Sequence, residues 1–218
     1  MSKNKAKLKL TITPDRTLAY HRGGSMRYLA CTVKTPHVNQ EVKPEQHLNL
    51  ALVIDASGSM QGYPLQAARD TALELVKMLH PKDVLSVVSF ADDFITHLSR
   101  KKMDEQGKWE AEREILRIEV RGCTDLAGGW FEGARQLTHA MDDDTSRRNH
   151  LILLSDGHAN RGITNPDELA THAGEMRERG LYTSTVGIGE GYSITQLQVL
   201  AEAGGGRMHD AQHPHEIA

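Results

Sequence analysis

From Leu48 onward, short apolar runs alternate with segments of helical periodicity, and this alternation restricts the possible folds more than any other feature. The apolar runs are residues 48–54, 83–90, 150–155 and 181–189. Their continuous apolar character is typical of strands that are covered by helices on both faces of a sheet. Strands that alternate with helices form βαβ units. The sequence therefore predicts an α/β fold with a doubly wound, mainly parallel sheet flanked by helices.

The segments between these strands have the pattern of amphipathic helices. We expect helices over residues 64–81, 104–118, 126–141, 165–180 and 193–204. Asn165 and Pro166 match a cap and a first turn, and Ser193 with Gln196 matches a capping box. Three glycines at 204–206 are expected to end the last helix. The segment "HDAQHPH" (209–215) that follows is expected to be a flexible tail.

Residues before the first buried strand have a different pattern. "KLKLTIT" (7–13) alternates with period two, "RYLACTV" (27–33) is a second candidate strand, and Gly23–Gly24 supplies a turn. We therefore expect three parts: a β-rich N-terminal extension (1–46), an α/β domain (47–210) and a C-terminal tail (211–218).

Composition excludes several classes of partner. The formal net charge is −3 and no long basic block is present, which disfavours nucleic acid and anionic membranes as partners. No apolar run approaches the ~20 residues that span a bilayer, and lysines interrupt the N-terminus before a signal-peptide core can form. Two widely spaced cysteines, Cys31 and Cys123, indicate neither a disulfide framework nor a zinc site. We therefore expect a cytoplasmic location without direct membrane insertion.

Oxygen-bearing side chains follow two of the predicted strands. Asp55, Ser57 and Ser59 come after the first strand, Asp156 follows the strand 150–155, and Thr124 precedes a helix. Ligands of such sheets bind beyond the carboxyl ends of the strands. Two carboxylates that lie close together repel each other unless one is protonated or a cation lies between them. With three hydroxyls beside them, the set predicts a hard divalent cation, Mg²⁺ or Mn²⁺.

These residues stand as Asp-x-Ser-x-Ser, then a Thr in a Gly-containing loop, then an Asp after a later buried strand. This order resembles the metal-ion-dependent adhesion site (MIDAS) of von Willebrand factor A domains, and the resemblance covers roughly residues 47–210. It implies that the hydroxyls coordinate directly and that the carboxylates coordinate directly or through water. One departure is Cys123, which stands where the family commonly has glycine and affects the shape of the loop rather than the ligand set.

The resemblance also implies a function. In the family, an Asp or Glu of a protein partner often fills the open position of the metal. We therefore expect a metal-dependent protein–protein interaction module, acting as a scaffold or adaptor. Intracellular bacterial proteins that the chain resembles accompany AAA+ ATPases, kinases or phosphatases. In some other relatives, an A domain is inserted into a β-sandwich, to which strands like those of the N-terminal extension would belong.

An enzyme is the alternative. Asp55 beside Mg²⁺ would be the phosphoryl acceptor of a phosphotransferase or phosphatase. Two residues further on, however, stands Ser57 rather than an acid, and no acid–base partner is identifiable, so we expect no enzymatic activity. The segment "GIGEG" (187–191) lacks the spacing of a dinucleotide-binding loop. His158 lies near Asp156 in the sequence but is left out of the ligand set.

Overall fold

The computed structural model describes residues 9–14, 28–34, 46–141, 147–189 and 192–211. The chain forms two compact units, Met1–Pro44 and Glu45–Ala218. Within the described residues, no helix combines the length and the apolar character that crossing a bilayer requires.

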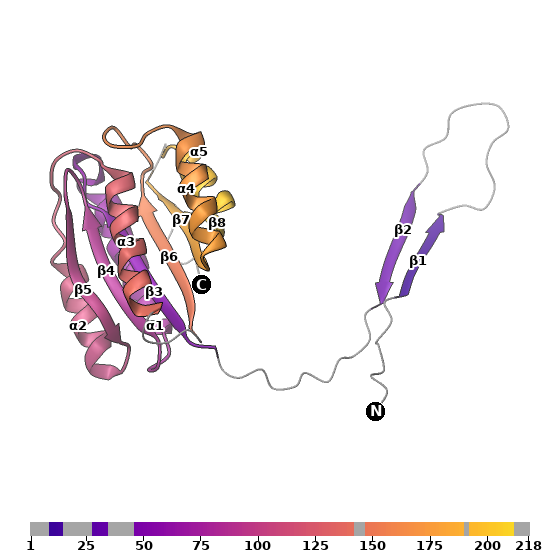
Figure 1. The fold of residues 1–218 in the computed structure, drawn as a ribbon, viewed down its shortest axis with the longest axis horizontal. Coiled ribbons are helices and arrows are strands. Elements are labelled where there is room, and N and C mark those ends of the chain that lie inside the picture. The colour runs from indigo at the N-terminus through magenta and orange to yellow at the C-terminus, as the bar shows by residue number, and fades with distance from the viewer. Residues whose placement is uncertain (1–8, 15–27, 35–45, 142–146, 190–191, 212–218) are drawn as a thin grey trace. The chain divides into compact units, whose positions relative to one another are not determined.

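The described part of the second unit contains one six-stranded sheet with the strand order β5-β4-β3-β6-β7-β8 (Figure 1). Its strands are β3 (Leu48–Asp55), β4 (Val84–Phe90), β5 (Phe94–Lys102), β6 (Arg148–Ser155), β7 (Leu181–Ile188) and β8 (Gly205–Ala211). Neighbouring strands are parallel except β4 and β5, which are antiparallel. The central strand β3 is apolar and almost wholly buried, as expected when helices cover both faces.

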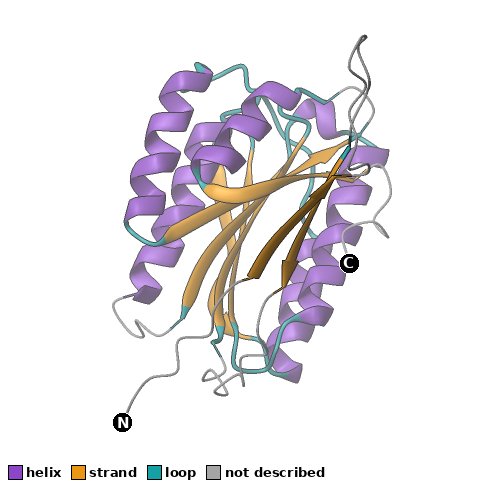
Figure 2. Ribbon diagram, turned by 90° about the vertical axis from the view of Figure 1, so that its right-hand side faces the viewer, coloured by secondary structure: helices purple, strands orange, loops and turns teal. Residues whose placement is uncertain are grey.

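Helices cover the two faces of this sheet (Figure 2). On one face, α1 (Tyr63–Met78) and α2 (Glu105–Leu116) pack against a cluster that includes Leu52, Ile54 and Leu85. On the other face, α3 (Leu126–Met141), α4 (Pro166–Glu178) and α5 (Ile194–Ala203) enclose a second cluster around Trp130. The predicted doubly wound, mainly parallel α/β fold is confirmed.

Two strands of the sheet were not predicted. Edge strand β5 is mostly exposed and rich in Lys and Arg, so it lacks the apolar run by which the other strands were recognised. Edge strand β8 begins at the second of three glycines, and a Cβ at Gly206 would lie 2.1 Å from the carbonyl oxygen of Thr183 on β7. These glycines therefore end a helix and also allow close approach of a strand.

Two further expectations at the C-terminal end are wrong. The predicted tail "HDAQHPH" begins inside β8, which contains His209, whereas His213 and His215 lie outside the described residues. The capping box at α5 is not formed, because Ser193 makes no side-chain cap. Gln196 instead accepts a hydrogen bond from the Ala159 N–H and donates to the Thr164 carbonyl. The predicted Asn165 cap of α4 is confirmed.

The first unit contains an antiparallel pair, β1 (Lys9–Pro14) and β2 (Leu29–Lys34). The register places Leu10 opposite Val33 and Ile12 opposite Cys31, so these four side chains share one face. Leu10, Ile12 and Val33 are more than half exposed. The predicted turn at Gly23–Gly24 lies outside the described residues.

Candidate functional site

The first part of the site is formed where β3 ends. Asp55 and Ser57 are buried, with 0% and 1% of their surface exposed, whereas Ser59 is exposed. Asp55 Oδ1 accepts the backbone N–H of Ser57 at 2.9 Å, which turns the chain sharply after the strand. The Ser57 and Ser59 hydroxyl oxygens then lie 3.1 Å apart. The following turn is anchored by Met60, whose side chain is fully buried in the core.

The loop before α3 supplies Thr124. The Gly58 N–H donates to the Gly122 carbonyl at 2.9 Å, which joins this loop to the turn after β3. Asn160 holds Thr124 from the other side, accepting its N–H at 3.0 Å and donating to its carbonyl at 3.2 Å. Thr124 is only 2% exposed, and its hydroxyl makes no hydrogen bond within the part of the chain that the structure describes. The Thr124 hydroxyl is therefore available to a ligand.

Asp156 follows β6, the parallel neighbour of β3. Ile54 pairs with Leu154 in the register, which brings Asp156 to the same edge of the sheet as Asp55. Its carboxylate Oδ1 accepts the His158 N–H at 3.1 Å, and its carbonyl accepts the Ser193 N–H at 2.8 Å. The next residue, Gly157, has a φ of +69°, and a Cβ there would lie 2.6 Å from the Ser193 carbonyl oxygen. Glycine at this position permits the close packing of the two loops.

The two carboxyl groups lie within each other's electrostatic field. The pKa of Asp55 is raised to about 6, mainly by burial and to a smaller extent by the charge of Asp156, although hydrogen bonds from Ser155 and Ser57 lower it. Among the described residues, no group of three or more His, Cys, Asp or Glu side chains is arranged to hold a metal. A cation between the two carboxylates would therefore need the neighbouring hydroxyls to complete its coordination.

The surrounding loops are tied together by residues that sequence reasoning did not select. Ser155 donates its hydroxyl to Asp55 Oδ2 at 2.5 Å, and no pattern in the sequence distinguished this serine from other strand residues. Asp92, after β4, forms an ion pair of 2.7 Å with Arg161, which precedes α4. The hydrogen bonds from Arg161 and from the Cys123 backbone N–H hold the pKa of Asp92 below its ordinary value.

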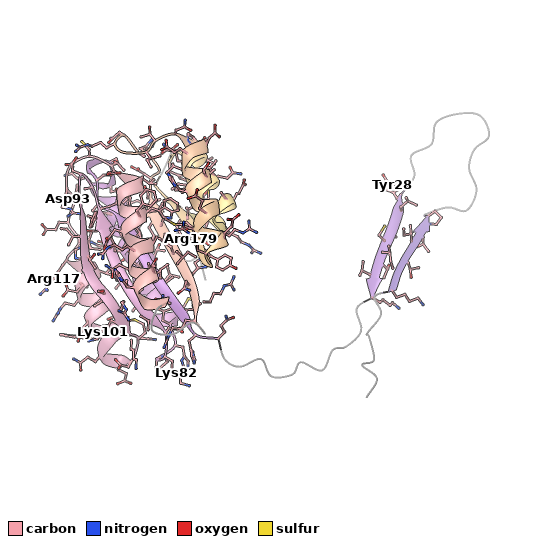
Figure 3. The ribbon with its side chains drawn as sticks, viewed as in Figure 1. Tyr28, Lys82, Asp93, Lys101, Arg117 and Arg179 are labelled. Atoms are coloured by element: carbon pink, nitrogen blue, oxygen red, sulfur yellow. The ribbon has the colours of Figure 1, made fainter. Side chains whose placement is uncertain are left out.

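A cysteine fits at position 123, where the sequence analysis noted glycine as the common residue, because the Cys123 side chain is exposed. The neighbouring Gly122 is the position that needs glycine, since a Cβ there would lie 1.5 Å from the Asp92 carboxylate. The structure thus brings the loops carrying the five predicted residues to one edge of the sheet. Figure 3 labels Asp93 at this edge, where β4 has ended, and Lys82 at the opposite edge, where β4 begins.

Fold and site together define an α/β domain whose loops gather two carboxyls and three hydroxyls at the carboxyl edge of its sheet. The sequence profile of the von Willebrand factor type A domain matches residues 49–216, and the chain belongs to this family.

Three comparisons illustrate the relationship. An uncharacterized protein of Synechocystis, sll0103, is 29% identical over 170 residues, which cover 78% of this chain and 39% of that protein. The chain thus spans about two fifths of the length of that relative. Proximal thread matrix protein 1 from the mussel byssus, solved with a zinc-occupied MIDAS motif, has a TM-score of 0.64 at 19% identity, covering 79% of this chain and 45% of that one. Manganese-loaded TRAP of Plasmodium vivax has a TM-score of 0.59 at 18% identity, and the match covers 72% of this chain and 63% of that one.

Proposed function

We propose that this chain is a metal-dependent protein-interaction module. One Mg²⁺ or Mn²⁺ ion would be held at the carboxyl edge of the sheet by Asp55, Ser57, Ser59, Thr124 and Asp156. The observation that carries the proposal is that the loops after β3, before α3 and after β6 bring two carboxyl groups and the Thr124 hydroxyl, which has no partner among the described residues, to one edge. A divalent cation would offset the repulsion between the carboxylates, and the hydroxyls are oxygen ligands of the kind that Mg²⁺ and Mn²⁺ accept.

The partner would present an Asp or Glu carboxylate to the metal. Two protein carboxylates only just neutralise a divalent cation, and any that binds through water neutralises it less. The metal therefore retains a preference for an anionic oxygen over a neutral carbonyl. The zinc and manganese named for the mussel and Plasmodium structures support a divalent metal at this site. The cytoplasmic location and an AAA+ ATPase, kinase or phosphatase as partner stay predictions.

The geometry does not favour Asp55 as a phosphoryl acceptor. Both of its carboxylate oxygens already accept hydrogen bonds, Oδ1 from the Ser57 N–H and Oδ2 from the Ser155 hydroxyl. Each oxygen keeps a second lone pair for a metal ion, but the two donors are a backbone N–H and a serine hydroxyl, neither of which is a general acid or base for phosphoryl transfer at neutral pH. The binding module is therefore the function that we propose.

Calorimetric titration of the metal-free protein with Mg²⁺ and Mn²⁺ tests the site. Asp55→Asn and Asp156→Asn should each lower metal affinity by at least about 100-fold, because each removes a charged ligand. Asp93→Asn is the matched control, since this carboxylate lies at the same edge, is 74% exposed and pairs with Arg121. It should bind metal like the unaltered protein. If Asp55→Asn and Asp156→Asn bind metal as tightly as Asp93→Asn and the unaltered protein, the site is ruled out.

Chelation separates a functional site from a structural one. The domain has two apolar clusters that do not depend on the site, so EDTA should leave its circular dichroism spectrum and cooperative unfolding intact. Capture of partners from a lysate in Mg²⁺ should be lost in EDTA and in Asp55→Asn. If the same partners bind in EDTA, the interaction surface lies elsewhere.

A further inference from the structure

A buried serine on β4 joins a histidine to an arginine. Ser89 lies near the end of β4 and is only 1% exposed. Its hydroxyl oxygen lies 2.7 Å from Nε2 of His97 on edge strand β5. Arg121 donates its Nη2 group to the same oxygen at 3.1 Å and to the Ser89 carbonyl at 3.3 Å. Ser89 is therefore the shared hydrogen-bond partner of a group that titrates and of a permanent cation.

Arg121 also connects two loops of the candidate metal site. Its backbone N–H donates to the carbonyl of Ala56, in the turn after β3, at 2.6 Å. The next residue, Gly122, accepts the N–H of Gly58 from the same turn at 2.9 Å. Thr124 follows in the same loop. The position of Arg121 therefore affects both the turn after β3 and the loop that carries Thr124.

The guanidinium of Arg121 has few other attachments. Its Nη1 atom lies 3.3 Å from Asp93 Oδ1, but the Asp93 side chain, labelled in Figure 3, is 74% exposed, so water screens this ion pair. Its Nε atom is buried and has no acceptor among the described residues. The hydrogen bonds to Ser89 are therefore the buried attachment of this side chain.

Protonation of His97 conflicts with this arrangement. Arg121 can only donate, so while His97 is neutral the Ser89 hydroxyl can give its one proton to His97 Nε2. A protonated His97 carries N–H groups at both ring nitrogens and must donate to Ser89. The hydroxyl oxygen would then lie between two cations, and its own proton would have no acceptor in the described part of the chain. The protonated state therefore favours separation of Arg121 from Ser89.

The charged groups that act on His97 come from two sides. Burial, followed by the charge of Arg121, lowers the pKa of His97, whereas Glu114 on α2 raises it. Glu114 also accepts hydrogen bonds from Arg113 and Arg117, which offset its charge. The closed arrangement therefore takes up a proton only below the ordinary histidine pKa of 6.5.

We propose that His97 is a pH switch for the loops of the candidate metal site. Neutral His97 leaves Ser89 free to hold Arg121. Protonated His97 displaces Arg121 and loosens the contact between the turn after β3 and the loop that carries Thr124. This loosening is a property of the metal-free chain, whereas its consequence, weaker metal binding in acid, rests on the proposed function.

Amide hydrogen exchange of the full chain in EDTA tests the switch. The Arg121 and Gly58 N–H groups are the probes, because their hydrogen bonds cross between the two loops. Exchange is measured at about pH 7 and about pH 5, corrected for intrinsic exchange and compared with β3 amides. The loss of protection in acid should be at least about tenfold greater in the unaltered protein than in His97→Gln. Asp55 titrates in the same range but is present in both proteins, so the difference between them belongs to His97.

His150→Gln is the matched control. His150 also lies 2.9 Å from a serine hydroxyl, that of Ser184 on the neighbouring strand, and burial also lowers its pKa. It belongs to β6, and its hydrogen bond to Ser184 on β7 does not involve the two loops. This variant should lose protection in acid as the unaltered protein does. Equal losses in His97→Gln and the unaltered protein, or an effect of His150→Gln as large as that of His97→Gln, would overturn the switch.

Calorimetric titration with Mg²⁺ at the same two pH values tests the consequence for the metal. Affinity should fall at least about threefold more in acid for the unaltered protein than for His97→Gln. If both proteins lose affinity equally, His97 does not regulate the site. If Mg²⁺ does not bind the unaltered protein at either pH, the proposed function fails, and hydrogen exchange still decides whether the switch exists.

Discussion

The Thr124 hydroxyl and the Asp55 carboxyl are used differently by the folded chain. Both residues are buried, but Asp55 accepts hydrogen bonds at both oxygens, whereas Thr124 is held by its backbone and its hydroxyl has no partner among the described residues. Asp55 therefore contributes to the local fold as well as to the candidate site. The Thr124 hydroxyl contributes to the site alone.

Thr124→Val separates metal binding from stability. The substitution keeps the shape of the side chain and removes a hydroxyl that the described fold does not use, so unfolding free energy should change by less than about 0.5 kcal/mol. Affinity for Mg²⁺ should fall about tenfold or more. Calorimetric titration and denaturant unfolding measure the two effects.

Thr185→Val is the control for Thr124→Val. Thr185 is also buried, but its hydroxyl donates to the Leu197 carbonyl at 2.9 Å, so its loss should cost about 1 kcal/mol and leave metal affinity unchanged. If Thr124→Val destabilises the fold without weakening Mg²⁺ binding, or if Thr185→Val weakens Mg²⁺ binding, the assignment of Thr124 is contradicted.

His150 should make stability depend on pH. Burial, followed by the charges of Arg148 and His209, lowers the pKa of His150 to about 4 from its ordinary value of 6.5. Between these values the unfolded chain binds the proton and the folded chain does not, so folding stability rises with pH. The contribution is complete above pH 6.5 and is lost as the pH falls toward 4.

The loss should be on the order of 2 kcal/mol between pH 7 and pH 4. Urea unfolding across this range measures it, with His150→Gln as the reference that lacks the titrating group. Parallel pH profiles for the two proteins would show that His150 does not carry this dependence.

At the scale of elements, edge strand β5 is attached to α3 by a polar seam rather than by an apolar one. Glu132 on α3 is 4% exposed and accepts hydrogen bonds from Thr96, Arg135 and Gln136. Ser99 on β5 extends the seam by donating to Gln136 at 2.7 Å. A seam of this kind stabilises the strand only while every donor keeps its acceptor.

Glu132→Ala should loosen β5 selectively. The three donors would lose their shared acceptor, at a cost of about 2–3 kcal/mol. Hydrogen exchange should show faster exchange of β5 amides than in the unaltered protein, while the central strand β3 keeps its relative protection. Glu132→Gln retains an acceptor oxygen and should cost less. Equal exchange in β5 and β3 after the alanine substitution would contradict a local role.

At the scale of the whole molecule, the two units differ in how they bury apolar surface. The unit Glu45–Ala218 has two clusters of buried residues, one on each face of its sheet. The described hairpin of the other unit exposes Leu10, Ile12 and Val33 on one face. A two-stranded hairpin is marginally stable by itself in water. The stability of the second unit is therefore expected to be independent of the first.

Removal of residues 1–44 tests this independence. The remaining chain should unfold cooperatively, with an unfolding free energy within about 0.5 kcal/mol of that of the full protein, because its core is complete. Its affinity for Mg²⁺ should also be unchanged. A truncated chain that aggregates or loses metal affinity would show that the N-terminal unit is needed by the domain.

The sequence by itself determined the fold class and the candidate metal residues. Buried parallel strands need continuous apolar runs, and such a run can be recognised within the sequence of the strand itself. The site residues follow these strands directly, so the order of strands already brings Asp55 and Asp156 toward one edge.

Only the tertiary structure decided the edges of the sheet and the partners of the site. Strand β5 is held in place by pairing with β4, and β8 by pairing with β7. Neither β5 nor β8 contains a continuous apolar run that identifies it in the sequence. Ser155 and Asn160 act on residues 100 and 36 positions away in the chain. Hydrogen bonds between distant segments have no local sequence pattern, because their geometry exists only when the chain has folded.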